Sequence, residues 1–483
     1  MTVANYDVAI VGAGAAGLSA ATEAVTSGAR VVLIDDNSQP GGQYFRQLPQ
    51  TFETATSAAQ NKAKRQFSAL RKVLDSPLLS YRPNATVWDF VDPLTLAIAD
   101  AERSGRVMAK SIIIATGARD NVVAFPGWTL PGVMTAGGLQ NLIKGMHIAP
   151  PGPVVVAGNG PLLLVAAASL VNAGVQVAAV VEAANQSWRI SLDIVNLALA
   201  PSILKLAAQY RLALLKAGTP ILRGHTVVAA HGDPDLHGVE IAAIDADGNI
   251  NRRKSLHYDV QTLITGFGLT PSLELARLLG AQEAFLPLRG GSTIVRSETL
   301  MTNVAGVFAA GDGAAIGGAA LSLVEGRIAG INACLHAGII SKKIAQTRLS
   351  KNLGTFRRLC QFRAGLERFF KTPAKWQQLL TSDTIICRCE DITLGQLEQA
   401  IAGDNTSSFQ LKAATRIGMG RCQGRNCLAS LAKIITGQQT LSSNEVAMPR
   451  SRQPAKPILI GALLHEELPA PDIPDDPHLP RKR

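Results

Sequence analysis

Tyr6-Asp-Val-Ala-Ile-Val-Gly-Ala-Gly-Ala-Ala-Gly17, followed by Val31-Val-Leu-Ile-Asp35, is the stretch that decides the fold of this chain. Val8–Val11 is a short apolar run rich in β-branched residues, which predicts a buried parallel strand. The run leads directly into a Gly-x-Gly-x-x-Gly turn and then into an Ala-rich segment that predicts a helix. The order strand, glycine-rich turn, helix and second strand ending in an acid predicts a dinucleotide-binding unit.

The glycines of this turn have separate roles. Gly12 allows the tight turn, Gly14 lets a pyrophosphate approach the backbone, and Gly17 lets helix and strand pack closely. The helix N-terminus offers unpaired N–H groups and a partial positive charge to the phosphates. The carboxylate of Asp35 can accept hydrogen bonds from a ribose hydroxyl. The alternative is a tight strand-to-helix turn that binds no ligand.

A second unit with the same order of elements begins at Val154-Val-Val-Ala-Gly-Asn-Gly160. Gly158 and Gly160 occupy the first two glycine positions, but Leu163 occupies the third. We expect this side chain to push the helix away from the strand and to crowd a pyrophosphate. Glu182, at the end of the next strand, suits an unphosphorylated ribose better than a 2′-phosphate. The unit either binds a second nucleotide or keeps the fold without one.

Three other glycine-containing stretches lie at the ends of predicted strands or in turns. They are Gln39-Pro-Gly-Gly-Gln43, Ile112-Ile-Ile-Ala-Thr-Gly-Ala118 and Gly306-Val-Phe-Ala-Ala-Gly-Asp-Gly313. Small residues at such turns let the backbone lie close to a ligand. An acid held beside glycines at a strand end can hydrogen-bond a polyol chain while backbone amides face phosphate.

Length and composition indicate the class of protein. At 483 residues the chain is long enough for two or three domains with full hydrophobic cores. Its 47% of hydrophobic residues and 44 glycines are typical of a glycine-rich α/β enzyme and argue against a disordered or fibrous protein. Apolar runs such as Ile112–Thr116 are too short to span a bilayer, and the first residues already begin a strand, so we expect no membrane span and no targeting segment. Four of the six cysteines fall between Cys387 and Cys427, unlike a disulfide framework, which favours a cytoplasmic location.

The positive charge is concentrated in one segment. The formal net charge of the chain is +11, and Ser341–Lys375 contains ten Lys or Arg residues and a single acid, Glu367. Apolar residues recur in this segment at helical spacing, which predicts a basic amphipathic helix. Its charged side is either a solvated face or a docking surface for an acidic partner. Nucleic acid is not expected, because no recognised binding module accompanies the charge.

The C-terminal part contains two cysteine pairs, Cys387-x-Cys389 and Cys422-x4-Cys427. Four thiolates can ligate the two irons of a [2Fe–2S] centre. Nearby glycines would let the backbone turn and direct N–H groups at sulfur, and nearby cations would offset the negative charge of the cluster: Gly418, Gly420 and Gly424, with Arg388, Lys412, Arg416, Arg421 and Arg425. The alternatives are a four-cysteine zinc site, which more often has Cys-x2–4-Cys in both halves, and four ordinary core cysteines.

The order of these motifs resembles the two-dinucleotide-binding flavoprotein superfamily, in which FAD lies along the first unit and a nicotinamide-binding unit is inserted into the FAD domain. The resemblance implies that the ADP half of FAD, the flavin and the ribityl–phosphate region are held by Gly12, Gly14, Gly17, Asp35, Gly42, Gln43, Thr116, Gly117, Gly311 and Asp312. A second nucleotide, NAD(H) or another, would be held by Gly158, Gly160 and Glu182. Disulfide reductases of this superfamily carry a cysteine pair beside the flavin, and neither nucleotide unit here contains a cysteine. Disulfide reduction is therefore not expected.

The context Gly-Met-Gly-x-Cys-Gln-Gly-Arg-x-Cys around the second cysteine pair resembles the bacterioferritin-associated-ferredoxin-like (BFD-like) [2Fe–2S] domain. It implies cluster ligation by Cys387, Cys389, Cys422 and Cys427. We therefore expect an α/β fold with two Rossmann-like dinucleotide-binding domains, the second inserted into the first, and a small C-terminal [2Fe–2S] domain. The expected parts are an FAD-binding domain at 1–122 and 264–340, an inserted NAD-like domain at 123–263, a basic helical linker at 341–380, the [2Fe–2S] domain at 381–440 and a Pro-rich tail at 441–483.

Over residues 1–465 the combination resembles the FAD-binding, [2Fe–2S]-containing subunit of the opine oxidase, hydrogen cyanide synthase and hydroxyproline dehydrogenase group. The resemblance implies an FAD-dependent electron-transfer subunit of a hetero-oligomeric amino-acid or opine (secondary amine) dehydrogenase. Its partner would be a flavoprotein similar to D-amino-acid or sarcosine oxidases, with or without a small ferredoxin-like subunit. The determinants of the substrate, whether opine, hydroxyproline, proline, sarcosine or glycine, are expected mainly in that partner, and no catalytic residue is singled out here. The alternatives are a self-contained NAD(P)H-dependent flavoprotein reductase that passes electrons to its own iron–sulfur centre and a non-enzymatic scaffold.

Overall fold

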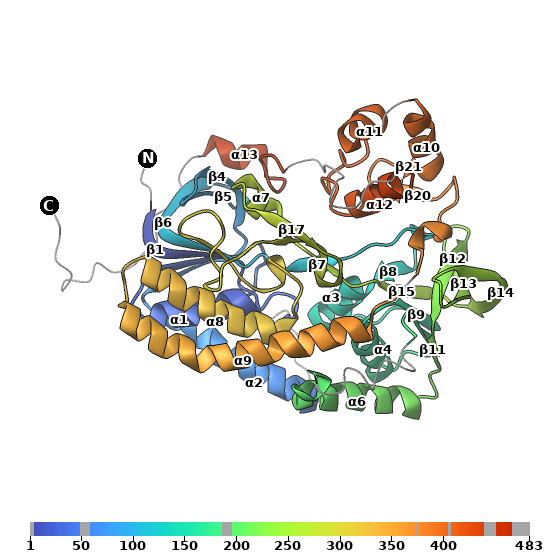
Figure 1. Ribbon diagram of the computed structural model, residues 1–483, viewed down its shortest axis with the longest axis horizontal. Helices are drawn as coiled ribbons and strands as arrows, with labels where there is room; N and C mark the ends of the chain where they lie inside the picture. Colours follow the sequence, from blue (N-terminus) through green and yellow to red (C-terminus); the bar gives the residue numbers. More distant parts are fainter. Residues whose placement is uncertain are drawn as a thin grey trace.

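The computed structural model describes residues 4–48, 58–185, 196–372, 374–403, 407–438 and 451–465. Figure 1 shows two α/β domains side by side, a long helix along one edge of both, and a small helical domain at the C-terminal end. The expected fold class is confirmed. Of the predicted Pro-rich tail, residues 441–450 and 466–483 lie outside the described residues.

The first domain is built on a seven-stranded sheet of order β3-β2-β1-β6-β5-β4, with β19 also paired to β6. Its strands are β1 (Ala4–Val11), β2 (Val31–Ile34), β3 (Leu79–Arg82), β4 (Thr86–Asp92), β5 (Thr95–Ala99), β6 (Ser104–Ile114) and β19 (Val307–Ala309). β1 is central and parallel to both neighbours, with Val8 opposite Val31 and Ser111. Because helices cover such a sheet, its strands are apolar on both faces, and β2 is buried throughout.

Two helices pack on the glycine-rich end of this sheet, α1 (Ala15–Thr26) and α8 (Ala319–His336). Their axes come close because small residues face each other, and a Cβ atom on Gly330 would lie 3.1 Å from the Cα of Ala20. The Ala-rich composition of α1 therefore serves helix packing as well as the turn before it. α2 (Ala58–Arg71) also belongs to this domain.

The second domain lies between two short crossing strands, β7 (Ala118–Asp120) and β16 (Leu269–Pro271), which pair antiparallel with each other. It contains a parallel sheet of order β11-β10-β9-β15-β8 and an antiparallel sheet of order β12-β13-β14. The strands are β8 (Val133–Thr135), β9 (Val154–Gly158), β10 (Val177–Glu182), β11 (Ile221–Arg223), β12 (His225–Gly232), β13 (Leu236–Ile244), β14 (Ile250–Asp259) and β15 (Thr262–Gly266). The helices are α3 (Ala136–Met146), α4 (Leu162–Asn172) and α6 (Pro201–Lys216). β15 continues past the expected domain boundary at residue 263, because it pairs with β9 through Gly266.

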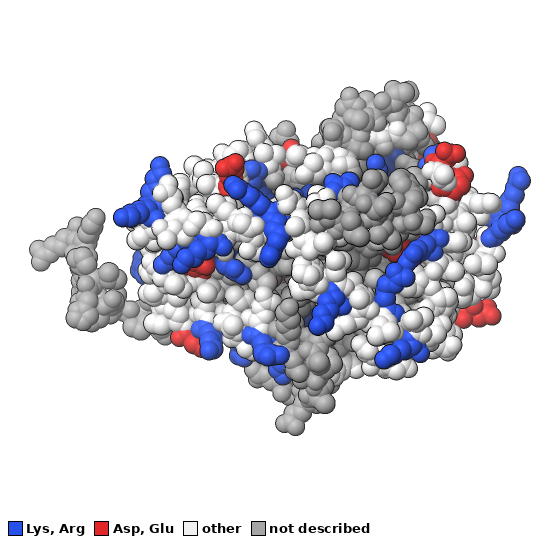
Figure 2. Space-filling model, turned by 60° about the horizontal axis from the view of Figure 1, so that its bottom comes forward, with Lys and Arg blue, Asp and Glu red and all other residues white. Residues whose placement is uncertain are grey.

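The predicted basic helix is α9 (Lys342–Phe369). Leu349, Leu353 and Phe356 pack on the core of the first domain. Further along the helix, Phe362 and Leu366 pack in a cluster with Leu197 and Ala200 of the second domain. The amphipathic pattern of α9 thus joins the two large domains, while many of its cations remain on the outside. Figure 2 shows the face that includes this edge, where Lys and Arg side chains are more frequent than Asp and Glu.

The small C-terminal domain contains a two-stranded sheet, β20 (Ile385–Cys387) and β21 (Ile392–Thr393), and the helices α10 (Leu394–Ala402), α11 (Ser408–Thr415) and α12 (Leu428–Gln438). Thr393 and Ser407 cap α10 and α11 by reciprocal capping boxes with Gln396 and Gln410. Its core, including Leu397 and Leu431, is continuous with the core of the second domain.

The segment 451–465 leads back to the first domain. There the N–H of Ala455 donates to the carbonyl of Trp88 at 2.7 Å, and the carbonyl of His465 accepts from the N–H of Ser104 at 3.1 Å. Its short helix α13 (Ile460–Leu464) lies against β6. Ala462 is fully buried, whereas Leu459, Ile460 and Leu464 remain exposed, so only part of this apolar run docks on the first domain. Within the described ranges, no helix combines the length and the hydropathy that crossing a bilayer requires.

Candidate cofactor sites

The first candidate site begins at the turn between β1 and α1. Gly12 has φ +107°, a conformation that L side chains rarely adopt, and its Cα lies against the main chain of Ala115 at the end of β6. The carboxylate of Asp35 accepts hydrogen bonds from the N–H of Ala13 and from the N–H of Asn37, the latter at 2.8 Å. Burial raises the pKa of Asp35, and the hydrogen bonds from Asn37 and Ala13 oppose that shift. The acid at the end of β2 therefore holds the glycine-rich turn in place.

The loop that contains Gly42 and Gln43 lies over this turn. A Cβ atom on Gly42 would be 2.9 Å from the Cα of Gly14, and the N–H of Gly41 donates to the carbonyl of Ala13 at 2.8 Å. Gly14 is the N-cap residue of α1, and no side chain caps the helix there. The first N–H groups of α1 thus remain available to an anionic ligand. Gln43 is exposed and accepts a hydrogen bond from Arg46 at 3.1 Å.

The other two predicted turns meet beside the first one. A Cβ atom on Gly313 would lie 2.8 Å from both the N of Gly117 and the Oγ1 of Thr116. Thr116 in turn donates to the carbonyl of Ser272 at 2.8 Å. The Oδ1 of Asp312 accepts from the N–H groups of Gly317 and Gly318, each at 2.8 Å, and burial raises the pKa of Asp312. Asp312 therefore shapes the entry to α8, and four stretches far apart in the sequence form one cradle.

Sequence reasoning missed an ion pair that supports this cradle. The Oε2 of Glu325 accepts from the N–H of Gly311 at 2.7 Å and from Arg296 at 2.8 Å. A second bond joins Arg296 to the Oε1 of Glu325 at 3.2 Å, and the Glu325 side chain is 3% exposed. An acid on an otherwise apolar helix was the signal that could have identified it. The ion pair between Arg296 and Glu325 thus holds the backbone of the Gly-Asp-Gly turn in place.

The cradle fits an extended dinucleotide. It combines an uncapped helix N-terminus, a backbone without side chains at Gly14 and Gly42, and an acid at the end of the second strand. These are the features by which α/β units hold a pyrophosphate and a ribose.

The second unit repeats this geometry with one difference from expectation. Leu163 is 1% exposed and packs in the domain core, so it does not crowd the turn. A Cβ atom on Gly266 would lie 2.9 Å from the Cδ2 of Leu163, which means that β15 provides the room that the third glycine provides in the first unit. The expected crowding of the turn by the Leu163 side chain is therefore not seen, and the binding of a nucleotide here stays a prediction. Gly160 donates to the Oε1 of Glu182 at 3.4 Å, and a Cβ atom on Gly160 would meet open space.

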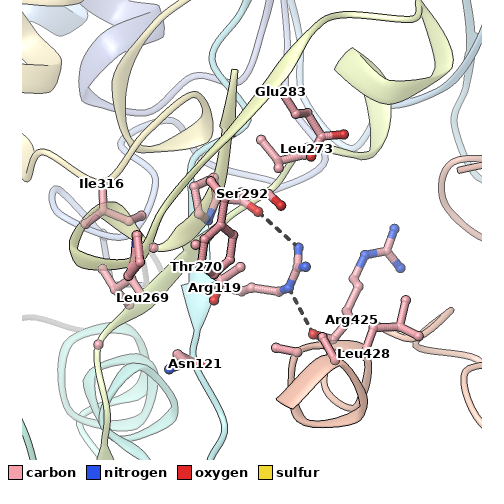
Figure 3. Close-up of a pocket in the computed structure, with 18 of the residues that line it drawn as sticks. Arg119, Asn121, Leu269, Thr270, Leu273, Glu283, Ser292, Ile316, Arg425 and Leu428 are labelled. Atoms are coloured by element: carbon pink, nitrogen blue, oxygen red, sulfur yellow. Dashed lines mark hydrogen bonds between the residues drawn. The ribbon is translucent and has the colours of Figure 1, made fainter. Parts of the chain in front are cut away.

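The end of α9 lies against this second turn. The side-chain amide of Asn159, between Gly158 and Gly160, donates to the carbonyl of Phe370 at 2.7 Å. Both residues line an open cavity of about 2400 Å³ whose walls come from the two large domains, α9 and the small domain. Figure 3 shows part of its wall, with Leu269, Thr270 and Ile316 from the first domain and Arg425 and Leu428 from the small domain.

The four predicted cluster ligands come together as two pairs of thiols. Cys387 lies at the end of β20 and interacts with Cys427, which directly precedes α12, while Cys389 interacts with Cys422. Cys387 and Cys427 are buried and Cys389 is exposed. In the described part of the chain, no group of three or more His, Cys, Asp or Glu side chains is arranged to hold a single metal ion. Two thiols on each side are the donor set of a two-iron cluster.

Backbone N–H groups point at one of these sulfurs. Burial acts to raise the pKa of Cys422, but hydrogen bonds from the backbone of Asn426, Gly424 and Arg425 outweigh it and lower the pKa. Gln423 has φ +53° within the same loop. Such a concave run of N–H groups favours a negatively charged sulfur. Two of the predicted nearby cations are already paired with acids, Arg416 with Glu390 at 2.8 Å and Arg425 with Glu274 at 3.1 Å.

Comparison with known proteins agrees with the two expected cofactors. The family model described as pyridine nucleotide-disulphide oxidoreductase matches residues 6–338, and the BFD-like [2Fe–2S] binding domain matches residues 385–436. One subunit of the opine oxidase of Agrobacterium tumefaciens (strain Ach5) is 31% identical over 474 residues, covering 95% of this chain and 92% of that protein. Hydrogen cyanide synthase subunit HcnB of Pseudomonas aeruginosa is 34% identical over 470 residues, covering 95% and 98%. The crystal structure of L-proline dehydrogenase from P. horikoshii is similar in fold, with a TM-score of 0.65 and 19% identity over 96% of this chain and 80% of that chain.

Proposed function

This chain belongs to the pyridine nucleotide-disulphide oxidoreductase family, and we propose that it is the electron-transfer subunit of a hetero-oligomeric dehydrogenase that oxidises the C–N bond of an amino acid or opine. Within the family it belongs to the group that contains the opine oxidase subunit and hydrogen cyanide synthase subunit HcnB. The chain is a flavin-dependent oxidoreductase with FAD and a [2Fe–2S] cluster as cofactors. When bound, these two groups supply the redox chemistry.

The residues that hold FAD in this proposal are those of the first cradle. The ADP half lies along Gly12, Gly14, Gly17 and Asp35, and the flavin lies near Gly42 and Gln43. Thr116 and Gly117 pack on the cofactor, and the ribityl–phosphate region lies near Gly311 and Asp312. The convergence of these four stretches supports the assignment. Asp35, Asp312 and Glu325 orient backbone N–H groups, so the chain presents fixed donors to the ligand.

Cys387, Cys389, Cys422 and Cys427 ligate the cluster in this proposal. The pairing of the thiols and the N–H groups directed at Cys422 support it. The single observation that carries the proposed function is that the cavity of about 2400 Å³ is lined both by strands of the FAD domain and by the cysteine loop. Arg119 and Ile316 of the FAD domain and Gln423 and Arg425 of the cysteine loop all line this space, which supports two redox centres close to it, as an electron-transfer subunit requires.

The partner that oxidises the substrate is a second flavoprotein subunit, similar to D-amino-acid or sarcosine oxidases, with or without a small ferredoxin-like subunit. The word subunit in the names of both relatives supports a complex. None of the six cysteines, all of which are described, forms a disulfide, and this supports the cytoplasm as the location in this proposal.

A second candidate function is an NAD(P)H-dependent reductase that passes electrons to its own cluster. The retained geometry of Gly158, Gly160 and Glu182 favours it, now that Leu163 is seen to leave the turn open. The contact of Asn159 with the end of α9 counts against it, because a nucleotide on this turn has to share the space with Phe370.

Two measurements test the proposed function. In the isolated chain, amino acids and opines should not reduce the flavin. Anaerobic NADH should not reduce it rapidly. Co-expression with the neighbouring oxidase-like gene product should yield a complex with dye-linked dehydrogenase activity on one of opines, hydroxyproline, proline, sarcosine or glycine. Fast flavin reduction by an amino acid in the isolated chain would place the catalytic site here, and fast reduction by NADH would favour the reductase.

A further inference from the structure

Three charged side chains join the FAD domain to the cysteine loop. The Oε1 atom of Glu274 accepts from the Nη1 of Arg119 at 2.9 Å and from the Nε of Arg425 at 3.1 Å. The Nε of Arg119 also donates to the main-chain carbonyl of Arg425 at 3.3 Å. Figure 3 shows Arg119 between the FAD-domain strands and the loop that carries Arg425. We call these three residues the interdomain triad.

On the FAD side, the triad starts at the turn whose Thr116 and Gly117 are assigned to packing on the cofactor. Arg119 follows Gly117 by two residues and lies in β7, where it is opposite Thr270 of β16. Glu274 is the first residue of α7 (Glu274–Leu278) and lies two residues after Ser272, whose carbonyl accepts from Thr116. A shift of Arg119 or Glu274 therefore moves backbone that adjoins the cradle.

On the other side, the triad ends within the cysteine loop. Arg425 lies between Cys422 and Cys427 and donates from Nη1 to the carbonyl of Cys422 at 3.3 Å. Its Nη2 donates to the carbonyl of Ala455 at 2.6 Å, and Ala455 is bound to Trp88 of β4. One guanidinium thus contacts the ligand loop, the FAD domain and the returning C-terminal segment.

Where the small domain meets the first domain at the triad, polar contacts hold the two together in place of a shared apolar core. The core of the small domain is continuous with the core of the second domain and not with those of the first. The triad side chains of Arg119, Glu274 and Arg425 are 24%, 17% and 18% exposed. Charge-assisted hydrogen bonds of this kind are stronger than neutral ones, and removing the shared acid leaves two poorly hydrated guanidinium groups side by side.

We propose that Glu274 is a positioning residue that holds the cluster-ligand loop against the FAD domain and thereby sets the separation of the two redox centres. The inference rests on the proposed function, which places both centres in this chain. Electron transfer through protein slows steeply with distance, so a loop that is free to move away from β7 transfers electrons less readily. The triad adds nothing to the chemistry of either centre and acts only through the position of the loop.

The test compares the full-length holoprotein with Glu274→Gln, which keeps the size of the side chain and removes its charge. We expect the backbone amides of residues 421–427 and 118–121 to exchange hydrogen about five- to thirty-fold faster, the range that corresponds to one or two kcal/mol. We also expect slower redistribution of electrons between flavin and cluster after rapid partial reduction, with both cofactors retained. The matched control is Glu283→Gln, which breaks the ion pair of Glu283 with Arg277 at 2.7 Å in the same cavity wall. It should change neither measurement.

Unchanged exchange or unchanged electron redistribution in Glu274→Gln would overturn the proposal, as would equal effects of the control. If Glu274→Gln fails to fold, Arg119→Gln serves with the same expected and contrary results. The proposed function fails separately: a wild-type chain purified without flavin or without cluster contradicts that function. The exchange measurement observes only amide hydrogens of the chain, so it still decides whether the triad holds the loop.

Discussion

At the scale of single residues, Gly14 is the position where a side chain would fit the protein itself but enter the space expected for the ligand. Its φ of −78° is allowed to any residue, and a Cβ atom would lie 3.9 Å from the Cα of Gly42. Gly14→Val should therefore fold, but its methyl groups would fill the space that the pyrophosphate needs. We expect the flavin content of the purified protein to fall about ten-fold or more, which corresponds to at least about 1.4 kcal/mol of binding free energy.

The measurement is the flavin absorbance per mole of folded protein, with folding checked by circular dichroism. Gly354→Val is a matched control, because Gly354 lies in α9 with no neighbour within 4 Å of a Cβ atom. A folded Gly14→Val protein with wild-type flavin content would refute the assignment of FAD to this turn.

Several backbone N–H groups converge on the thiol of Cys422. We therefore expect the cluster to be sensitive to the replacement of this residue. Cys422→Ser should abolish or severely weaken the iron–sulfur absorbance and leave FAD in place, because the cradle belongs to another domain. Iron, sulfide and flavin analysis of anaerobically prepared protein checks this. Cys360→Ser, in the half-buried part of α9, is the control and should retain the cluster. Stoichiometric zinc without iron or sulfide in the wild type would contradict the iron–sulfur assignment.

At the scale of elements, α9 has two sides with different tasks. Its apolar side is used to join the two large domains. The cations Arg357, Arg358 and Arg363 stand out in the sequence as a docking surface, but Arg363 donates to Glu367 and to the carbonyl of Leu288, each at 3.0 Å. Arg363 is therefore a structural residue, and the exposed set on α9 includes Lys351, Arg357 and Arg358.

Replacement of Lys351, Arg357 and Arg358 by Gln should slow association with an acidic partner protein about ten-fold at low salt and leave both cofactors in place, because such charges act mainly by steering. Surface plasmon resonance against the partner at two salt concentrations measures this. The control removes the same charge from another exposed helix face, at Lys205, Arg211 and Lys216 of α6. Equal rates for both triple variants would identify the cationic side of α9 as a solvated face.

At the scale of the whole molecule, two of the three domains share a hydrophobic core, and the third has cores of its own. The first domain has two cores of its own, whereas the second domain and the small domain are continuous through one apolar cluster. FAD bound to the first domain should therefore stabilise that domain selectively, since a ligand stabilises the part that binds it.

Calorimetry of the flavin-free protein should show one transition that rises in temperature when FAD is added. At about a hundred times the dissociation constant the gain is about 2.7 kcal/mol. The second transition, from the second and small domains, should move little, and Gly14→Val should show no shift. Equal shifts of both transitions would mean that the domains unfold as one unit.

The sequence alone determined the two dinucleotide-binding units and singled out the four cysteines, while the insertion of one unit into the other was implied by the resemblance to a known superfamily. The physical reason is that these features are local: strand periodicity, the glycine positions of a tight turn and ligand spacing are written in consecutive residues. The helix that follows the Gly12 turn and the basic helix α9 appear where the pattern predicted them. The resemblance to known families added the cofactors.

Tertiary structure alone decided what depends on residues far apart in the sequence. Gly266 makes room for Leu163 from a strand about a hundred residues away, and Phe370 closes on the second turn from the end of α9. The same holds for Glu325 behind the Gly-Asp-Gly turn and for Glu274 between Arg119 and Arg425. The space available to a side chain and the partner of a buried charge depend on neighbours in three dimensions. The spacing of residues within a motif does not encode them.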